Sequence, residues 1–481
     1  MQVVRYVDRR VVVLKHIGSA RTEQELVALE ENGRQWYRLS QEQDTLFARS
    51  TEALVPDGTV FLGTRHDLAH DTLKAVATHC GLDALCDPML IDLAIMRLVE
   101  PTSKLRAIGL IETYFGVQYA QRTLYRALSS MVLHKQAVER IAVQYAKEQL
   151  GDQLTMVLYD VTTLYFESFK ADELRIPGFS KDNMAQQPQI VVGLLVTREG
   201  FPLGYEVFPG NTFEGKTMLP MLEAFVAAHG VTMPTVVADA AMLSHTLLTE
   251  ITARGMSYIV GARLANSSPK VTKAISASLD QRDGALVRVP SPHGDMVCSF
   301  SAKRYKKDKR TLEQQVAKAK TLVQKGEPGK RSKFVKSKGS KDGYEFNEAL
   351  LLKATSLLGI KGYCTNIPEK DLSSMGVIAR YHDLWQVEKA FRMAKNDLAA
   401  RPIYHRTEMA VRSHILICFA AMIMGRAMEL AANKPLRVII DALWAVSDAR
   451  LFHQPTSTEH RLRSPVPPST LELLRKLNLS Y

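Results

Sequence analysis

A mixed α/β fold is predicted for the centre of this chain, and three features of the sequence support the prediction. From residue 154 onward, short apolar runs of strand length alternate with segments of helical periodicity. Turn signals rich in Gly and Pro separate these runs, as in R-E-G-F-P at residues 198–202. Two of the runs stop at an aspartate, and the ends of strands in α/β sheets are where reactive groups collect.

Length and composition limit the classes of protein that need to be considered. The chain has 481 residues, which corresponds to roughly three domains of about 150 residues. It is 46% hydrophobic and 23% charged, and it carries a net charge of +12 that favours a polyanionic partner. Its five cysteines are scattered without a C-x-x-C pair, so neither a disulfide scaffold nor a zinc site is indicated, and a cytoplasmic location fits best.

Neither secretion nor membrane insertion is expected. The first ten residues are charged where a signal peptide would need an apolar stretch. The longest apolar run, residues 415–425, has eleven residues, whereas a membrane span needs about 20. This run is interpreted as a buried core helix, and no membrane partner is expected.

The elements before the sheet form a mixed region, 1–80, and a helical region, 81–150. In the first, strand-like runs at 11–14, 36–39 and 59–62 accompany a helix at 23–31. In the second, a helix at 119–128 would present Arg122 and Arg126 on one face, as a helix-turn-helix reader of DNA does. An ordinary surface helix with solvated arginines would have the same pattern.

The predicted sheet begins in residues 151–263. Strands are expected at 154–160, 190–196, 203–208 and 234–239, with a helix at 216–228 before the last of them. A further helix and a strand at 258–261 follow. An insertion, 264–352, with strand-like runs at 285–289 and 296–300, then separates this part from a second part of the core, 353–430, and from a helical tail, 431–481.

The positive charge is concentrated in the insertion. Residues 303–341 hold fifteen Lys and Arg against three acids, which leaves the rest of the chain neutral. This distribution favours a local contact with a polyanion, although a solvated loop would also explain a charge run. The candidate DNA contacts in this segment are Lys303, Arg304, Lys306, Lys307, Arg331 and Lys333.

Three carboxylates are candidates for catalysis and metal binding. Asp160 and Asp239 end the apolar runs, and Glu388 lies in the segment R-Y-H-D-L-W-Q-V-E-K-A-F-R-M-A-K. If that segment is one helix, Tyr381, Glu388 and Lys395 share a face. Two Mg²⁺ ions (or Mn²⁺) clamping a scissile phosphate need such hard oxygen ligands.

A competing motif lies at 210–217. G-N-T-F-E-G-K-T, from Gly210 to Thr217, satisfies the P-loop pattern G-x-x-x-x-G-K-[ST] of ATPases. Glu214 would place a carboxylate among the backbone N–H groups that should bind phosphate, and the preceding run ends in Pro. A plain loop before a helix is therefore the preferred interpretation.

The acidic segments resemble those of bacterial insertion-sequence transposases of the DDE class, in the branch with the Y-R-E-K signature. The resemblance rests on D-V-T-T-L-Y-F-E at Asp160, V-V-A-D before Asp239, Y-x-x-x-W-x-V-E-x-A-F-R-x-x-K-x-D-L through Glu388, and R-P-I-Y-H after it. It covers most of the chain. It implies a ribonuclease H-like catalytic sheet interrupted by a β-rich insertion, and two metal ions per active site.

The resemblance also implies partners and residue roles. The partners would be double-stranded DNA, both transposon ends and target, and a second copy of the chain. Tyr381 and Lys395 keep their signature places, but Leu384 stands where the signature has Arg. If the contact made by that Arg has simply been lost, Leu384→Arg should be tolerated. If Arg392 has replaced it, Arg392→Ala should impair catalysis. A P-loop ATPase, a metal-dependent nuclease without strand transfer and a non-catalytic DNA-binding protein are the alternatives.

Overall fold

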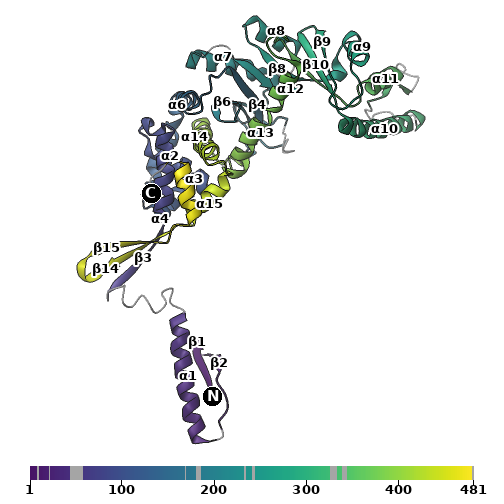
Figure 1. Cartoon of the computed structure of the whole chain (residues 1–481). Coiled ribbons are helices and arrows are strands. Elements are labelled where there is room, and N and C mark those ends of the chain that lie inside the picture. Colours follow the sequence, from purple (N-terminus) through teal and green to yellow (C-terminus); the bar gives the residue numbers. More distant parts are fainter. Residues whose placement is uncertain are drawn as a thin grey trace. The chain divides into compact units, whose positions relative to one another are not determined.

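The computed structural model describes residues 1–7, 10–20, 22–43, 58–167, 169–179, 186–231, 234–240, 244–325, 333–337 and 344–478 (Figure 1). The chain divides into two compact units. The first comprises Met1–Arg65 and Ser447–Ser464, and the second comprises His66–Val446 and Pro465–Tyr481.

The first unit contains a hairpin, a long helix and a small sheet. Strands β1 (Gln2–Val7) and β2 (Arg10–His16) pair antiparallel, and α1 covers Glu23–Gln43. The strand expected at 36–39 is wrong, because these residues belong to α1, whose Glu, Gln, Leu and Arg residues are good helix formers. The small sheet has the order β15 (Thr458–Arg463), β14 (Asp448–His453), β3 (Thr59–Arg65). The segment expected to be a helical tail therefore also holds the β14–β15 hairpin.

The second unit begins with five helices, four of which lie in the predicted helical region 81–150, whereas the first lies in the region predicted as mixed. They are α2 (Asp67–His79), α3 (Pro88–Val99), α4 (Lys104–Phe115), α5 (Gln121–Leu128) and α6 (Lys135–Glu148). Local capping sets two of their beginnings: Asp87 accepts a hydrogen bond from Leu90 N, and Ser103 accepts one from Arg106 N. Gly116 ends α4 in the left-handed conformation, with φ of 74°.

An eight-stranded mixed sheet forms the body of the unit. Its spatial order is β6 (Pro202–Pro209), β5 (Gln189–Val196), β4 (Met156–Tyr165), β7 (Thr235–Ala238), β8 (Tyr258–Ala262), β13 (Ile360–Thr365), β10 (Gly294–Phe300), β9 (Leu286–Ser291). Strands β4, β5 and β6 pair antiparallel, whereas β7 and β8 run parallel to β4. The first five strands thus have the 3-2-1-4-5 order of the ribonuclease H-like fold, as expected.

Helices cover both faces of the sheet at β4. Tyr159 donates its hydroxyl to Thr217 Oγ1 at 2.8 Å, at the start of α7 (Met218–His229). Because side chains alternate along a strand, Thr162 and Leu164 point to the opposite face, where they lie with Phe391 of α13 (Trp385–Arg392). Asp160 belongs to this second face.

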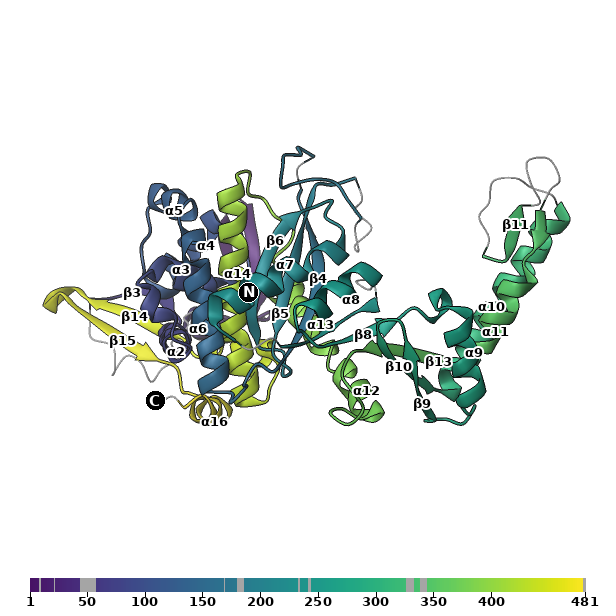
Figure 2. The ribbon, with the colours of Figure 1, turned by 90° about the horizontal axis from the view of Figure 1, so that it is seen from above.

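Helix α14 (Glu408–Ala432) is the central helix of the unit. It packs against α3 and β6, and Figure 2 shows it between the helical region and the sheet. It is long and apolar enough to cross a membrane, but 83% of its most apolar window is buried. The interpretation of 415–425 as a core helix is confirmed.

The insertion extends the sheet and adds helices of its own. Strands β9 and β10 match the runs expected there, and β11 (Val335–Ser337) pairs with β12 (Tyr344–Phe346). Helices α9 (Pro269–Ser278), α10 (Ala302–Lys325) and α11 (Glu348–Ser356) accompany them. Val271, Ile275 and Phe300 contribute to a separate small core, so the insertion is both helical and β-structured.

The segment 381–395 is not one helix. Helix α12 (Ser374–His382) ends before α13 begins at Trp385, and Met393–Asp397 forms a π-helical turn. Asp383 lies at the break, where its carboxylate pairs with Arg198 at 2.8 Å. The remaining helices are α8 (His245–Ala253), α15 (Leu436–Trp444) and α16 (Pro468–Lys476).

Candidate active site

Asp160 and Asp239 occupy equivalent positions on neighbouring strands. Leu158 of β4 pairs with Val237 of the parallel strand β7, and this is the last pair between the two strands. Each aspartate lies two residues beyond it, Asp160 within β4 and Asp239 just after β7. The expectation that Asp160 ends its strand is wrong, because β4 continues to Tyr165 in its pairing with β5, whereas Asp239 does follow the last residue of β7.

Tyr381 orients Asp239. Its hydroxyl donates a hydrogen bond of 3.0 Å to Asp239 Oδ1, which also accepts from Ala240 N at 2.7 Å. Burial raises the pKa of Tyr381, and the neighbouring Asp239 charge raises it further, so the phenol stays protonated and remains a donor. Gly261 permits this approach, since a Cβ there would come within 2.5 Å of the Tyr381 hydroxyl oxygen.

Lys361 is a site residue that the sequence pattern did not predict. Its ammonium lies over the rings of Tyr381 and Tyr363, 4.7 and 5.2 Å from their centroids. Burial lowers the pKa of Lys361 and Arg304 lowers it further, whereas the carboxylates of Asp239 and Glu388 act in the opposite direction. The ammonium is therefore within electrostatic reach of both acids.

Glu388 lies on α13, exposed to solvent and near the Tyr381 and Lys361 pair. Within the described ranges, no three His, Cys, Asp or Glu side chains are close enough together to hold a metal ion. Asp239 and Glu388 thus both lie near Tyr381 and Lys361, and Asp160 lies on the strand next to β7, but the three are not gathered into one metal-sized group. Carboxylates repel one another at short range unless a cation lies between them.

The other residues of the predicted face lie on different elements. Lys395, in the π-helical turn, lines a small cavity with Thr162 and Leu164, so it shares the face of β4 that carries Asp160. Arg392 is exposed at the end of α13, one turn beyond Glu388.

Leu384 belongs to the core. Its side chain is only 6% exposed and lies in the main apolar cluster of the unit. This burial argues against the expectation that arginine is tolerated at this position, because a guanidinium there would be buried without a partner.

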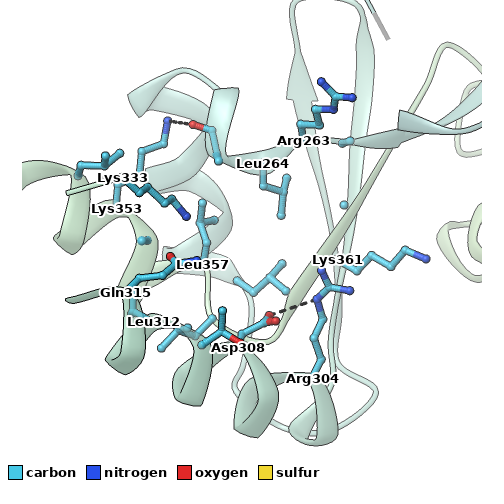
Figure 3. A pocket seen from close by; sticks show the side chains of 18 residues that line it. Arg263, Leu264, Arg304, Asp308, Leu312, Gln315, Lys333, Lys353, Leu357 and Lys361 are labelled. Carbon is cyan, nitrogen blue, oxygen red and sulfur yellow. Dashed lines mark hydrogen bonds and ion pairs between the residues drawn. The ribbon is translucent and has the colours of Figure 1, made fainter. Parts of the chain in front are cut away.

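The predicted basic contacts cluster on α10 and around a cavity beside Lys361. Lys303, Lys306 and Lys307 are exposed on α10, and Arg304 pairs with Asp308 at 3.3 Å. Figure 3 shows the cavity, about 430 Å³ in volume; its basic lining residues are Arg263, Arg304, Lys333, Lys353 and Lys361. Arg331 lies outside the described residues.

Arg122 and Arg126 are both exposed on α5. Leu124 and Leu128 anchor the opposite face of this short helix in the core. The two arginines are free to meet an external partner, as the helix-turn-helix interpretation requires.

The P-loop-like motif does not form a nucleotide cradle. It follows β6, an antiparallel edge strand, whereas a P-loop follows a buried parallel strand. The Gly210 carbonyl accepts a hydrogen bond from Gln189, and Thr217 Oγ1 donates to Glu214 O at 2.6 Å while accepting from Tyr159. The threonine that would hold Mg²⁺ in an ATPase is already occupied.

Comparison with known proteins gives one family. The family model described as the transposase DDE domain matches residues 154–424, which include all three acids. No curated protein matches the sequence. Among solved structures, the chain is similar to a piggyBac transposase in a synaptic complex with hairpin DNA, with a TM-score of 0.40, 9% identity and coverage of 78% of this chain and 76% of that one. Since the family match spans more than half of the sequence, this chain belongs to the transposase DDE domain family.

Proposed function

We propose that this protein binds the ends of a mobile DNA element, cleaves them with divalent metal and joins them to target DNA by transesterification. In the joining step, the 3′-hydroxyl oxygen of an element end forms a bond to a phosphorus of the target DNA. The bond between that phosphorus and the 3′ oxygen of the target strand breaks. The observation that supports the proposal is the parallel pairing of β4 with β7 at the centre of a ribonuclease H-like sheet, two residues before Asp160 and Asp239.

The residues around this pair have distinct roles in the proposal. Asp160, Asp239 and Glu388 would hold two Mg²⁺ or Mn²⁺ ions, and their donor chemistry fits, since carboxylate oxygens are the ligands that such hard cations prefer. When bound, the ions would polarise the scissile phosphate and stabilise the leaving oxygen. Tyr381 holds Asp239 Oδ1 by its hydrogen bond, which directs Oδ2 away from α12.

The cations of the site would position the DNA backbone. Lys361 lies near Asp239 and Glu388, and Lys395 and Arg392 lie on the two elements that continue from Glu388; in the proposal they contact successive phosphates on either side of the cleaved bond. Arg122 and Arg126 would contact DNA farther from the chemistry. Two ends must be held together for joining, so we propose that a dimer of the chain forms on DNA.

The product of the reaction tests the proposed function. Purified protein, duplex DNA carrying the inverted repeats that flank its coding region, a target plasmid and Mg²⁺ should yield joined products without ATP. Chelation of Mg²⁺ should abolish them, and Lys216→Ala, in the P-loop-like motif, should leave the joining rate within about tenfold of the parent, or about 1.4 kcal/mol in barrier. Cleavage without joining would identify a nuclease, and an absolute ATP requirement would favour the ATPase alternative.

Neutralising α10 should flatten the salt dependence of DNA binding. Four exposed cations on this helix share one face through steps of three and four: Lys303, Lys306, Lys307 and Arg310. Each phosphate contact contributes a slope of about −0.9 in log K against log salt. Replacing all four with Gln should therefore reduce the slope by roughly 3 to 4, with little change in sequence preference.

Fluorescence anisotropy with a labelled duplex would measure both slopes. The control replaces four exposed cations of other helices with Gln: Arg140, Lys147, Arg437 and Lys476. Equal slopes for the two variants would show that the charge of α10 only aids solubility.

A further inference from the structure

A second cluster of cations lies away from the acids, in a cavity of about 410 Å³. Arg97 of α3 and Lys104 of α4 line it and are only 6% and 4% exposed. Arg401, His405 and His414 complete its basic lining. None of its described lining residues is Asp or Glu.

Arg97 and Lys104 donate their hydrogen bonds to neutral groups. His414 Nε2 lies 3.0 Å from Ala400 O and must donate to it, so Nδ1 is the acceptor. Lys104 Nζ and Arg97 Nη2 both donate to that nitrogen, at 3.2 and 3.4 Å. Arg97 Nη1 donates to the carbonyls of Leu398 and Ala399. Across the described ranges, neither Arg97 nor Lys104 has a carboxylate partner.

The position of Lys104 adds to this excess of positive charge. It is the first residue of α4, whose N-cap is Ser103. The N-terminus of a helix carries a partial positive charge, which disfavours a cation and favours an anion. Burial and the neighbouring charge of Arg97 lower the pKa of Lys104 well below its ordinary value, and a bound anion would oppose this by favouring the charged ammonium.

We propose that this cavity is a binding site for a phosphate group, held by Lys104, Arg97 and the N-terminus of α4. A tetrahedral oxyanion presents several acceptor oxygens at once, which matches donors converging from separate elements. The volume exceeds that of one phosphate group and leaves room for part of the molecule that carries it.

The cavity is linked to the proposed active site by β4. Ile403 N donates to Tyr165 O at 3.1 Å, and Phe166 forms a bridge with Ile403, which fixes the segment that carries Arg401 and His405 at the end of this strand. Asp160 lies five residues earlier, about 17 Å along the strand. The phosphate could belong to the DNA that the active site cleaves or to a free phosphate compound, and the two sources can be distinguished by experiment.

Thermal unfolding of the full chain tests the site without any need for catalysis. Near neutral pH, up to about 10 mM inorganic phosphate should raise the Tm relative to chloride of equal ionic strength, following mass action. Concentrations are kept low because phosphate at high concentration stabilises proteins in general. Lys104→Met should lose this response while its Tm in chloride equals or exceeds that of the parent, since a buried amine whose charged form is disfavoured has been replaced by an apolar chain.

Lys147→Met, which removes an exposed lysine of α6, is the matched control and should keep the full response. An identical phosphate response in Lys104→Met and the parent would overturn the proposal, as would a parent that does not respond. Both outcomes are independent of whether the chain cleaves DNA. The phosphate site can therefore be confirmed when the proposed function is wrong, and the proposed function can be confirmed when the phosphate site is wrong.

The pH dependence gives a second measurement if Lys104→Met does not fold. Burial, together with the charges of Lys104 and Arg97, lowers the pKa of His405 to about 4. His414 also faces it, 5.4 Å away between ring centroids. Unfolded His405 therefore binds protons between about pH 6.5 and 4 while folded His405 does not, so stability falls as the pH falls through this window. The variant His405→Gln shows how much of this loss of stability is due to His405. Bound phosphate should reduce that part of the loss, and a pH dependence of stability that is the same with and without phosphate would contradict the proposal.

DNA binding identifies the source of the phosphate. If a backbone phosphate occupies the cavity, Lys104→Met should weaken duplex binding, reduce the salt slope by about 0.9, and make inorganic phosphate a poorer competitor. If a free phosphate compound is the ligand, duplex affinity should match that of the parent while the Tm response to phosphate is still lost.

Discussion

Asparagine at position 160 or 239 is expected to lower the rate of end cleavage at least roughly 10³-fold while leaving affinity for end DNA almost unchanged. Amide and carboxylate have the same shape, so Tyr381 can still donate to the oxygen at position 239. What is lost is the negative charge that a divalent cation requires, and that interaction is worth several kcal/mol. The expected loss follows from charge and not from altered packing.

Single-turnover cleavage of a labelled end duplex would measure the rate, and anisotropy would measure the affinity. Asp71→Asn, which changes an exposed aspartate of α2, should cleave at the parental rate and control for the loss of one charge. Metal-dependent cleavage by the position-239 variant at the parental rate would show that Asp239 is not part of the active site. It would also contradict the proposal that Asp160 and Asp239 bind metal together.

Leu384→Arg should destabilise the protein by about 3–5 kcal/mol, the range observed when a charge is buried without a partner. Leu384 lies just before α13 and is packed in the main core, so the guanidinium could reach water only by displacing this helix. Because α13 carries Glu388, cleavage should fall together with the Tm. Denaturant unfolding would measure the loss of stability.

Leu384→Met is the control, since a swap that conserves volume in the core usually costs less than about 1.5 kcal/mol. If the arginine variant were as stable as the parent, the side chain at 384 could not be a fixed part of the core. Arg392→Ala separates the two roles, because it should lower cleavage with little effect on stability: Arg392 is exposed.

The pattern of the sequence predicted most elements of the catalytic sheet, because strand-length apolar runs and Gly–Pro turns are local signals. Strands β5, β6, β9 and β10 and helix α7 lie close to their expected bounds. The prediction of a shared face for Tyr381, Glu388 and Lys395 required 381–395 to be one helix. This prediction is wrong, because the segment is divided between α12, α13 and a π-helical turn. A break at Asp383 and a π-helical turn after Arg392 depend on packing and on the long-range ion pair with Arg198.

The sequence by itself determined that Asp160, Asp239 and Glu388 are the acids to consider, that the excess charge lies in residues 303–341, and that residues 415–425 form a core helix. Only the tertiary structure decided that Asp160 lies in the interior of its strand, that Lys361 lies near two of the acids, and that Leu384 is buried. It also brought His414 into one cavity with Arg97 and Lys104, which lie more than 300 residues earlier in the chain. Periodicity reports which face of an element a residue occupies, whereas the partner of that face is set by sheet order and helix packing, which no local pattern encodes.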